Sequence, residues 1–160
     1  MSRRGAELAL LLLGGFRTFA DRATAELAAR GYPDVRPVHD FALHAILSGA
    51  DNASELGRRM SVTKQSAAKT IAALQEHGYV AREPDPVDRR RMRLQVTDRG
   101  HAMLHEGETI FDELRAQWES QVGPEAVANL EHTLRGFLGD NTIRLDKPAG
   151  WLVQDSSSDA

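Results

Sequence analysis

Apolar residues recur at helical spacing along most of the chain. Between Leu8 and Leu27 they follow one another at steps of four and three, which places them on one face of a helix. The same spacing predicts further helices over residues 38–46, 52–60, 63–77, 98–122 and 127–138. Glycine or proline lies at the end of most of these segments. The pattern therefore predicts a mainly α chain of about six helices.

Two short segments depart from this pattern. Residues 79–83 and 93–97 carry apolar positions typical of short strands, and residues 84–92 between them hold two prolines and three consecutive arginines. Thr97 or Asp98 can then cap the long helix that follows. A short helix, a turn, a second helix and a basic hairpin occur in the order of a winged helix-turn-helix. We therefore predict that fold, with a two-stranded β wing.

Residues suited to helix ends support the boundaries of the motif. Asn52 or Ser54 can cap its first helix by accepting from main-chain N–H groups of the first turn. Thr63 can do the same for the second helix, and Gly78 is suited to the position just after its end. Both helices of the motif are therefore marked by local sequence as well as by apolar spacing.

Charge is distributed unevenly along the chain. Its total of −3 argues against a nucleic-acid partner, but residues 58–93 hold nine basic and four acidic side chains, a net of +5 that leaves −8 for the remainder. A local basic surface on an acidic body is typical of phosphate binding. The alternative is a solvated charged face, and the adjacent helix-turn-helix pattern favours DNA.

The candidate DNA contacts on the second helix lie largely off its apolar stripe, in its N-terminal half. Motifs of this type insert that end into the major groove. The set comprises Thr63, Lys64, Gln65, Ser66, Lys69 and Thr70. Gln65 is the best candidate for reading a base, because a carboxamide can pair with adenine at two points. Lys64 and Lys69 are better suited to phosphate.

The chain resembles the MarR family of bacterial transcription regulators over roughly residues 8–138. Residues 84–91 (PDPVDRRR) match that family's wing signature, an Asp followed two and three positions later by Arg-Arg. Residues 74–80 (LQEHGYV) match the end of its recognition helix, and residues 94–100 (LQVTDRG) match its exit into a long helix. Three motifs in order and at family spacing make the resemblance specific.

The resemblance implies an intertwined, triangular homodimer with its recognition helix in the major groove. It implies that Arg90 enters the minor groove and that Asp88 orients it. A wing tip with three arginines can reach the narrow groove, and alternation along an extended wing leaves Arg89 and Arg91 for phosphate. The alternative for Asp88 is a turn with its own backbone.

The predicted division of the chain follows from these elements. Residues 1–34 and 101–146 form a helical dimerisation region, residues 35–100 the winged helix-turn-helix, and residues 147–160 a flexible C-terminal tail rich in Ser and Asp. Extra apolar residues between Leu8 and Leu13 widen the face of the first helix. Such a helix is either an internal core helix or a dimer seam, and the resemblance favours the seam.

A small organic effector is a further implication of the resemblance, with a pocket between the first, second and fifth helices. Phe16, Phe19, His39 and His44 are its candidate lining residues. The alternative is that the phenylalanines belong to the core and the histidines are structural.

Other chemistry has little support in the sequence. His101, His105 and Glu108 could present a metal-binding face at helical spacing, but two exposed histidines on a charged face are the favoured interpretation, and no metal site or cofactor is predicted. The chain has no cysteine, which excludes disulfides, thiolate zinc sites and cysteine-based peroxide sensing.

No enzymatic motif and no membrane segment is expected either. A nucleophile elbow, a Gly-rich phosphate loop and a His-Glu-x-x-His motif are all missing, so we predict that the protein is not an enzyme. The apolar run near residue 10 superficially resembles a secretion signal, but it is short, Glu7 precedes it, and Arg17, Asp21 and Arg22 follow closely. No run reaches the length of a membrane span. We expect a cytoplasmic protein.

The sequence thus predicts a DNA-binding transcriptional regulator, with repression favoured over activation. It would bind a palindromic operator as a homodimer and be released by a small organic effector. The alternative is a winged-helix protein-interaction module without DNA binding. That alternative would require an apolar exposed face on the second helix of the motif, contrary to Lys64, Gln65 and Lys69.

Overall fold

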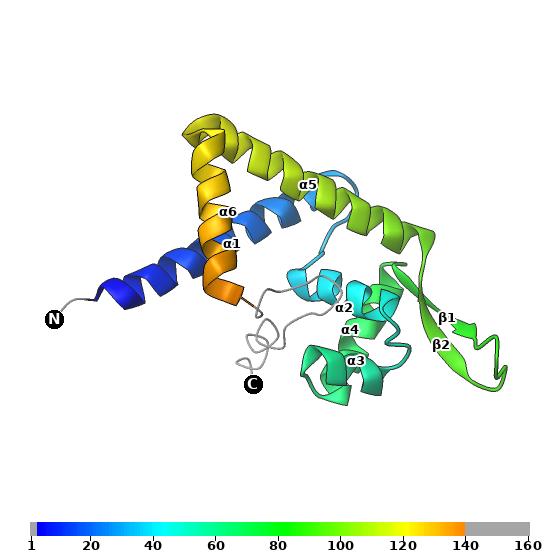
Figure 1. The fold of residues 1–160 in the computed structure, drawn as a ribbon. Helices are drawn as coiled ribbons and strands as arrows, with labels where there is room; N and C mark the ends of the chain where they lie inside the picture. The colour runs from blue at the N-terminus through cyan, green and yellow to red at the C-terminus, as the bar shows by residue number, and fades with distance from the viewer. Residues whose placement is uncertain (1–2, 140–160) are drawn as a thin grey trace. The chain divides into compact units, whose positions relative to one another are not determined.

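The computed structural model describes residues 3–139 and has the predicted winged helix-turn-helix fold (Figure 1). Over these residues it contains six helices and one antiparallel sheet of two strands. The elements are α1 (Arg4–Ala29), α2 (Pro37–Leu47), α3 (Ala53–Met60), α4 (Lys64–Glu76), β1 (Val80–Pro84), β2 (Met92–Val96), α5 (Asp98–Val122) and α6 (Pro124–Leu138). The tail predicted for residues 147–160 lies outside the described residues.

The chain divides into two compact units. One holds the residues up to Val35 together with His105–Leu134, and the other holds Arg36–Leu104 with the described residues from Arg135 onward. The first contains α1 and most of α5, and the second contains α2, α3, α4 and the β hairpin. The predicted assignment of residues 1–34 and 101–146 to dimerisation, and of residues 35–100 to DNA, stays a prediction.

Local capping fixes the helix-turn-helix. The Asn52 side chain accepts from the main-chain N–H of Glu55 at 2.9 Å, so Asn52, and not Ser54, caps α3. Thr63 Oγ1 accepts from the N–H of Ser66 at 3.0 Å and caps α4, as predicted. After α4, Gly78 has φ of 77°, the left-handed conformation that a glycine after a helix adopts easily.

Close packing at the turn depends on a second glycine. A Cβ on Gly57 would lie 2.9 Å from the carbonyl oxygen of Val62. The absence of a side chain therefore lets the turn between α3 and α4 approach the α3 backbone. Ser61 makes that turn in the left-handed region, with φ of 56°.

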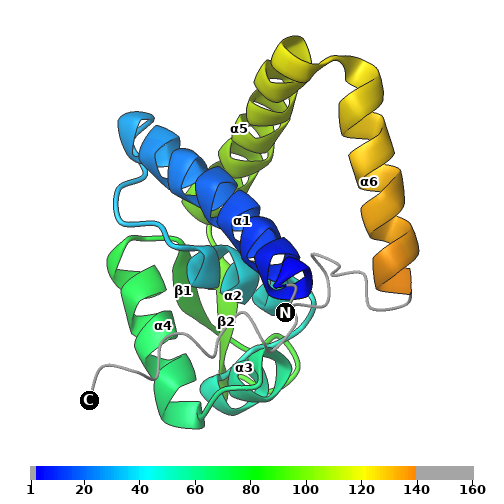
Figure 2. The same ribbon diagram turned by 90° about the vertical axis from the view of Figure 1, so that its left-hand side faces the viewer.

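The core of this unit comes from the predicted apolar stripes. Ala67, Ile71 and Leu74 of α4 are buried, and so are Leu56 and Met60 of α3. Further fully buried side chains from the same unit are Leu43, Tyr79 and Met103. In both ribbon views α3 and α4 lie side by side, with α2 next to them (Figure 2).

The wing strands pair from Val80 opposite Val96 to Pro84 opposite Met92. Each strand is displaced by one residue from the predicted segments 79–83 and 93–97. Thr97 lies just after β2. Its N–H still donates across the hairpin to the Tyr79 carbonyl, but its hydroxyl accepts from the N–H of Gly100 at 3.1 Å. Thr97 thus caps α5, which resolves the choice between Thr97 and Asp98.

The other unit is built on α1 and α5. Ala23 and Leu27 of α1 and Ile110 of α5 are buried. Arg30, just after α1, donates to Glu106 at 3.0 Å and to Glu113 at 2.6 Å, and these carboxylates raise the pKa of its guanidinium. At Gly123 and Pro124 the chain turns back from α5 into α6 (Figure 2).

A large apolar surface of α1 remains exposed. Its six large residues between positions 8 and 16 have exposed fractions of 41–67%. They are Leu8, Leu10, Leu11, Leu12, Leu13 and Phe16. Apolar patches of this kind mark sites of association. None of the helices in the described part of the chain combines the length and apolar character needed to cross a bilayer.

Candidate nucleic-acid interface

The N-terminal half of α4 presents polar side chains outward. Lys64, Gln65 and Lys69 are exposed, whereas Ala67 and Ile71 on the opposite side are buried. Within residues 3–139 the side chains of Lys64, Gln65 and Lys69 have no hydrogen bond or ion pair. Three long side chains with hydrogen-bond donors are therefore available to a partner at this end of the helix.

The three hydroxyl residues predicted here have other roles in the free chain. Thr63 Oγ1 caps the helix by accepting from Ser66, and Thr70 Oγ1 donates to the Ser66 carbonyl at 3.3 Å. Ser66 and Thr70 are half-buried. The Thr63 hydroxyl therefore fixes the start of the helix, and the contacts of Thr63, Ser66 and Thr70 with DNA stay a prediction.

The wing loop between β1 and β2 is folded by its own carboxylates. Asp85 accepts from the main-chain N–H groups of Val87 at 2.8 Å and Asp88 at 3.4 Å. The Val87 N–H is the main cause that lowers the pKa of Asp85. The N–H of Asp85 donates to the Arg91 carbonyl at 2.8 Å, and the N–H of Arg91 donates to the Asp88 carbonyl at 3.0 Å. These bonds define one conformation for the tip.

Asp88 forms a turn with its own backbone, which was the alternative to the prediction that it orients Arg90. Its carboxylate accepts from the main-chain N–H of Arg90 at 3.1 Å. The predicted contact between Asp88 and the Arg90 guanidinium on DNA stays a prediction. The side chains of Arg89 and Arg90 are exposed and form no ion pair with any described residue.

Arg91 differs from its two neighbours. Its Nη2 lies 2.9 Å from Oδ1 and 3.0 Å from Oδ2 of Asp51, the residue before the α3 cap. Sequence reasoning assigned Arg91 to phosphate, and in the free chain the guanidinium has a protein partner instead. Asp51 was not identified from the sequence, because it is separated from Arg91 by forty positions.

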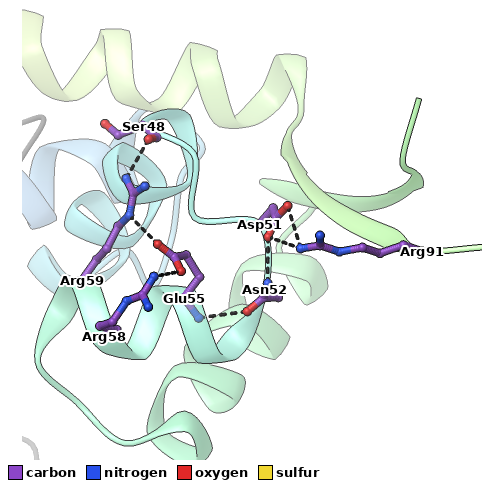
Figure 3. Close-up of polar contacts among 7 residues, drawn as sticks. All are labelled: Ser48, Asp51, Asn52, Glu55, Arg58, Arg59 and Arg91. Atoms are coloured by element: carbon purple, nitrogen blue, oxygen red, sulfur yellow. Dashed lines mark hydrogen bonds and ion pairs between the residues drawn. The ribbon is translucent and has the colours of Figure 1, made fainter. Parts of the chain in front are cut away.

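A polar network extends from Asp51 along α3 (Figure 3). Glu55 pairs with Arg58 and with Arg59 Nε, the latter at 3.2 Å, and Arg59 Nη1 donates to the Ser48 carbonyl at 2.7 Å. The two arginines, Arg58 first, lower the pKa of Glu55. This network joins the end of α2 to α3.

The network reduces the basic character expected from the sequence. Asp51 and Glu55 lie just outside residues 58–93, yet they neutralise arginines within that range. The net charge is +5 for residues 58–93, and it is +3 for residues 51–93, which include both carboxylates. Within residues 58–93 the cations without a described ion pair are then Lys64 and Lys69 on α4, Arg82 and Arg93 on the wing strands, and Arg89 and Arg90 at the wing tip.

The predicted effector residues fall in both units. Phe19 lies edge-on to Trp118, with ring centroids 6.0 Å apart, and lines a hollow of about 260 Å³ between α1 and α5. Phe16 is 41% exposed. His39 is buried and its Nδ1 accepts from the Arg36 N–H at 3.2 Å, while His44 lies 3.7 Å from Asp40. Both histidines thus have structural partners, and the effector site stays a prediction.

No cluster of three or more potential metal ligands is found among residues 3–139. His101, His105 and Glu108 are all exposed on α5.

Comparison with known sequences shows a match at the winged helix. Residues 37–91, from the start of α2 to the wing, match the family model of the MarR family. Over 72 residues the chain is 28% identical to the HTH-type transcriptional regulator BilQ of Clostridioides difficile. That match covers 45% of the chain and 46% of BilQ, so the chain spans about half the length of this relative.

Solved structures share the fold over a longer range. The reduced form of MarR from E. coli has a TM-score of 0.65 and 22% identity, covering 82% of this chain and 96% of that one. A mutant of MepR from S. aureus bound to an oligodeoxyribonucleotide has a TM-score of 0.59 and 17% identity, covering 84% and 98%. The shared fold and the match over residues 37–91 confirm the predicted resemblance.

Proposed function

The chain carries the winged helix-turn-helix of the MarR family, and we propose that it is a transcriptional regulator that binds specific DNA sequences as a homodimer. In this proposal it is a cytoplasmic repressor without enzymatic activity, and a small organic effector releases it from a palindromic operator. The S. aureus MepR mutant of the same fold is bound to an oligodeoxyribonucleotide, which supports DNA as the partner.

The observation that carries the proposal is the position of the unpaired donors. Lys64, Gln65 and Lys69 lie on the exposed side of α4, and Arg89 and Arg90 lie at the wing tip. Cations that approach phosphates supply affinity, whereas a carboxamide on base edges supplies sequence preference. Arg90 is assigned to the minor groove and Lys64, Lys69 and Arg89 to phosphate.

The homodimer follows from the exposed apolar residues of α1. A symmetric dimer would present two α4 helices to two half-sites about 34–36 Å apart, or a multiple of that distance. The operator is then an inverted repeat, because its symmetry mirrors that of the protein.

The protein-interaction alternative has less support. A winged helix that binds a protein partner through α4 needs an apolar exposed face, and the exposed positions of α4 near its start are Lys64, Gln65, Ala68 and Lys69. Three of these four side chains are polar or charged.

Selection from a library of random duplexes tests the proposal. We expect the wild-type chain to enrich an inverted repeat. We expect Gln65→Ala to lose preference at one or two base pairs per half-site, at a cost of about 1–3 kcal/mol for each. Gln121→Ala, the same change at an exposed position of α5, is the matched control and should select the wild-type sequence.

Two results would count against it. If the wild-type chain enriches no sequence at any salt concentration, specific DNA binding is wrong. If Gln65→Ala keeps every base preference, the protein can still be a regulator, but Gln65 does not read a base.

A further inference from the structure

Asp51 joins the wing to the helix-turn-helix through three separate bonds. Its carboxylate accepts from Arg91 at 2.9 and 3.0 Å, and its carbonyl accepts from the N–H of Leu94 in β2 at 2.9 Å. The Asn52 side chain also donates to its Oδ1 at 2.8 Å. Figure 3 shows Arg91 reaching back from the hairpin to this residue.

The position of Asp51 is well defined from the α3 side. Asn52, the next residue, caps α3 through Glu55. Glu55 in turn pairs with Arg59, which donates to the end of α2. Asp51 is 30% exposed and Arg91 52% exposed in their side chains. An ion pair this accessible contributes little to global stability, so its effect should be local.

Fixing Arg91 also fixes the tip of the wing. The Arg91 main chain bonds to Asp85 and to Asp88, and these three residues enclose Arg89 and Arg90. The Asp85 carboxylate accepts through Oδ1 from the N–H groups of Val87 and Asp88, and the Arg91 side chain bonds to Asp51 instead. Asp51 is therefore the carboxylate that holds the Arg91 side chain.

We propose that Asp51 is a positioning residue of the DNA interface, which holds the wing through Arg91 so that Arg89 and Arg90 are presented to DNA. Arg91 is then a tether and not a phosphate contact. This inference rests on the proposed function, and it replaces the assignment of Arg91 to phosphate that the sequence predicted.

The positioning role and simple electrostatics predict opposite changes in DNA affinity for the substitution Asp51→Asn. Asp51→Asn removes a negative charge close to the interface, and by charge alone it should strengthen binding to a polyanion. If Asp51 positions the wing, the same change makes the wing tip more mobile. It then weakens binding, because ordering the wing tip on DNA costs conformational entropy. Glu83→Gln is the matched control: it removes one charge from an exposed position of β1 that has no described ion pair.

The first experiment needs no DNA. Backbone ¹⁵N relaxation of the free protein should show that Asp51→Asn and Arg91→Gln raise the mobility of the Asp88–Arg91 amides, whereas Glu83→Gln does not. Unchanged order parameters in Asp51→Asn would overturn the tether, whether or not the protein binds DNA. A wild-type chain that bound no duplex would instead overturn the proposed function, so the two failures are distinguishable.

The second experiment measures affinity for the selected duplex. We expect Asp51→Asn and Arg91→Gln each to weaken binding about threefold to tenfold, and the double variant to be no weaker than the worse single one. Glu83→Gln should bind as tightly as the wild type or more tightly. The proposal would be overturned if Asp51→Asn bound the duplex as tightly as Glu83→Gln does. It would also be overturned if the fold-losses of affinity in the two single variants multiplied in the double variant.

Salt dependence gives an independent test of the role of Arg91. A direct phosphate contact predicts that Arg91→Gln alone lowers the slope of log Kobs against log salt concentration by about 0.9. A tether predicts that Asp51→Asn and Arg91→Gln change the slope alike. A slope change confined to Arg91→Gln would show that Arg91 binds phosphate.

Discussion

Replacing Leu12 by alanine should weaken the proposed homodimer. Leu12 lies on the apolar stripe of α1, and 41% of it is exposed in the single chain. If this surface is the dimer seam, a second copy covers that fraction. The substitution keeps a strong helix former in place, so it should change the interface and not α1 itself.

The magnitude follows from the exposed fraction. Full burial of a leucine side chain is worth about 1.5–3 kcal/mol, so covering the exposed 41% of Leu12 contributes about 0.6–1.2 kcal/mol for each copy. A symmetric interface loses this twice, which gives about 1–2.5 kcal/mol. The dimer dissociation constant should therefore rise about fivefold to seventyfold.

Sedimentation velocity over a concentration series measures that constant. Leu47→Ala is the matched control, because Leu47 is 48% exposed but lies at the end of α2, in the other unit. Circular dichroism should confirm equal helix content in both variants. Equal dissociation constants for Leu12→Ala and Leu47→Ala would refute the assignment of the seam to α1. A wild-type chain that is monomeric at micromolar concentration would refute the dimer itself.

Three further predictions concern stability. Thr63→Ala removes the acceptor for the Ser66 N–H and should lower the free energy of unfolding by about 1 kcal/mol in urea titration, while Thr63→Ser should retain most of it; equal losses in both would contradict the capping role. Gly100→Ala places a Cβ 2.3 Å from the Tyr79 carbonyl oxygen and should cost about 1–3 kcal/mol. Gly107→Ala, where a Cβ meets no atom within 4 Å, should be neutral or stabilising by the same assay. The folded chain lowers the pKa of Asp85 below its ordinary 3.8, so the stabilisation that this carboxylate gives the wing loop is present above that pH and is lost as pH falls through the lower, folded value. The protection factor of the Val87 amide, which is its intrinsic exchange rate divided by its observed rate, should therefore fall on acidification in the wild type and stay constant in Asp85→Asn.

Much of the fold could be predicted from the sequence because its determinants are local. A helix cap bonds to a group three residues away, as Thr63 does to Ser66. A glycine after a helix takes a conformation that other residues rarely adopt, as Gly78 does. Apolar spacing shows which face of a helix is buried, and Ile71 and Leu74 are buried as the spacing predicted.

The candidate site was predictable in part, for the same reason. The outward side of α4 follows from its buried side, so the exposure of Lys64, Gln65 and Lys69 could be read from the pattern. Where two local interactions competed, the pattern left the choice open. Asn52 or Ser54 could cap α3, and only the approach of the chain to the helix decided for Asn52.

Only the tertiary structure decided the role of Arg91. In the sequence it is one of three consecutive arginines, and alternation along the wing groups it with Arg89 as a phosphate contact. Pairing of the two wing strands returns the chain to the start of α3, where the Leu94 N–H bonds to the Asp51 carbonyl and the Asp51 carboxylate meets the Arg91 guanidinium. An ion pair between residues forty positions apart depends on where the chain places both side chains, and no local pattern encodes that distance.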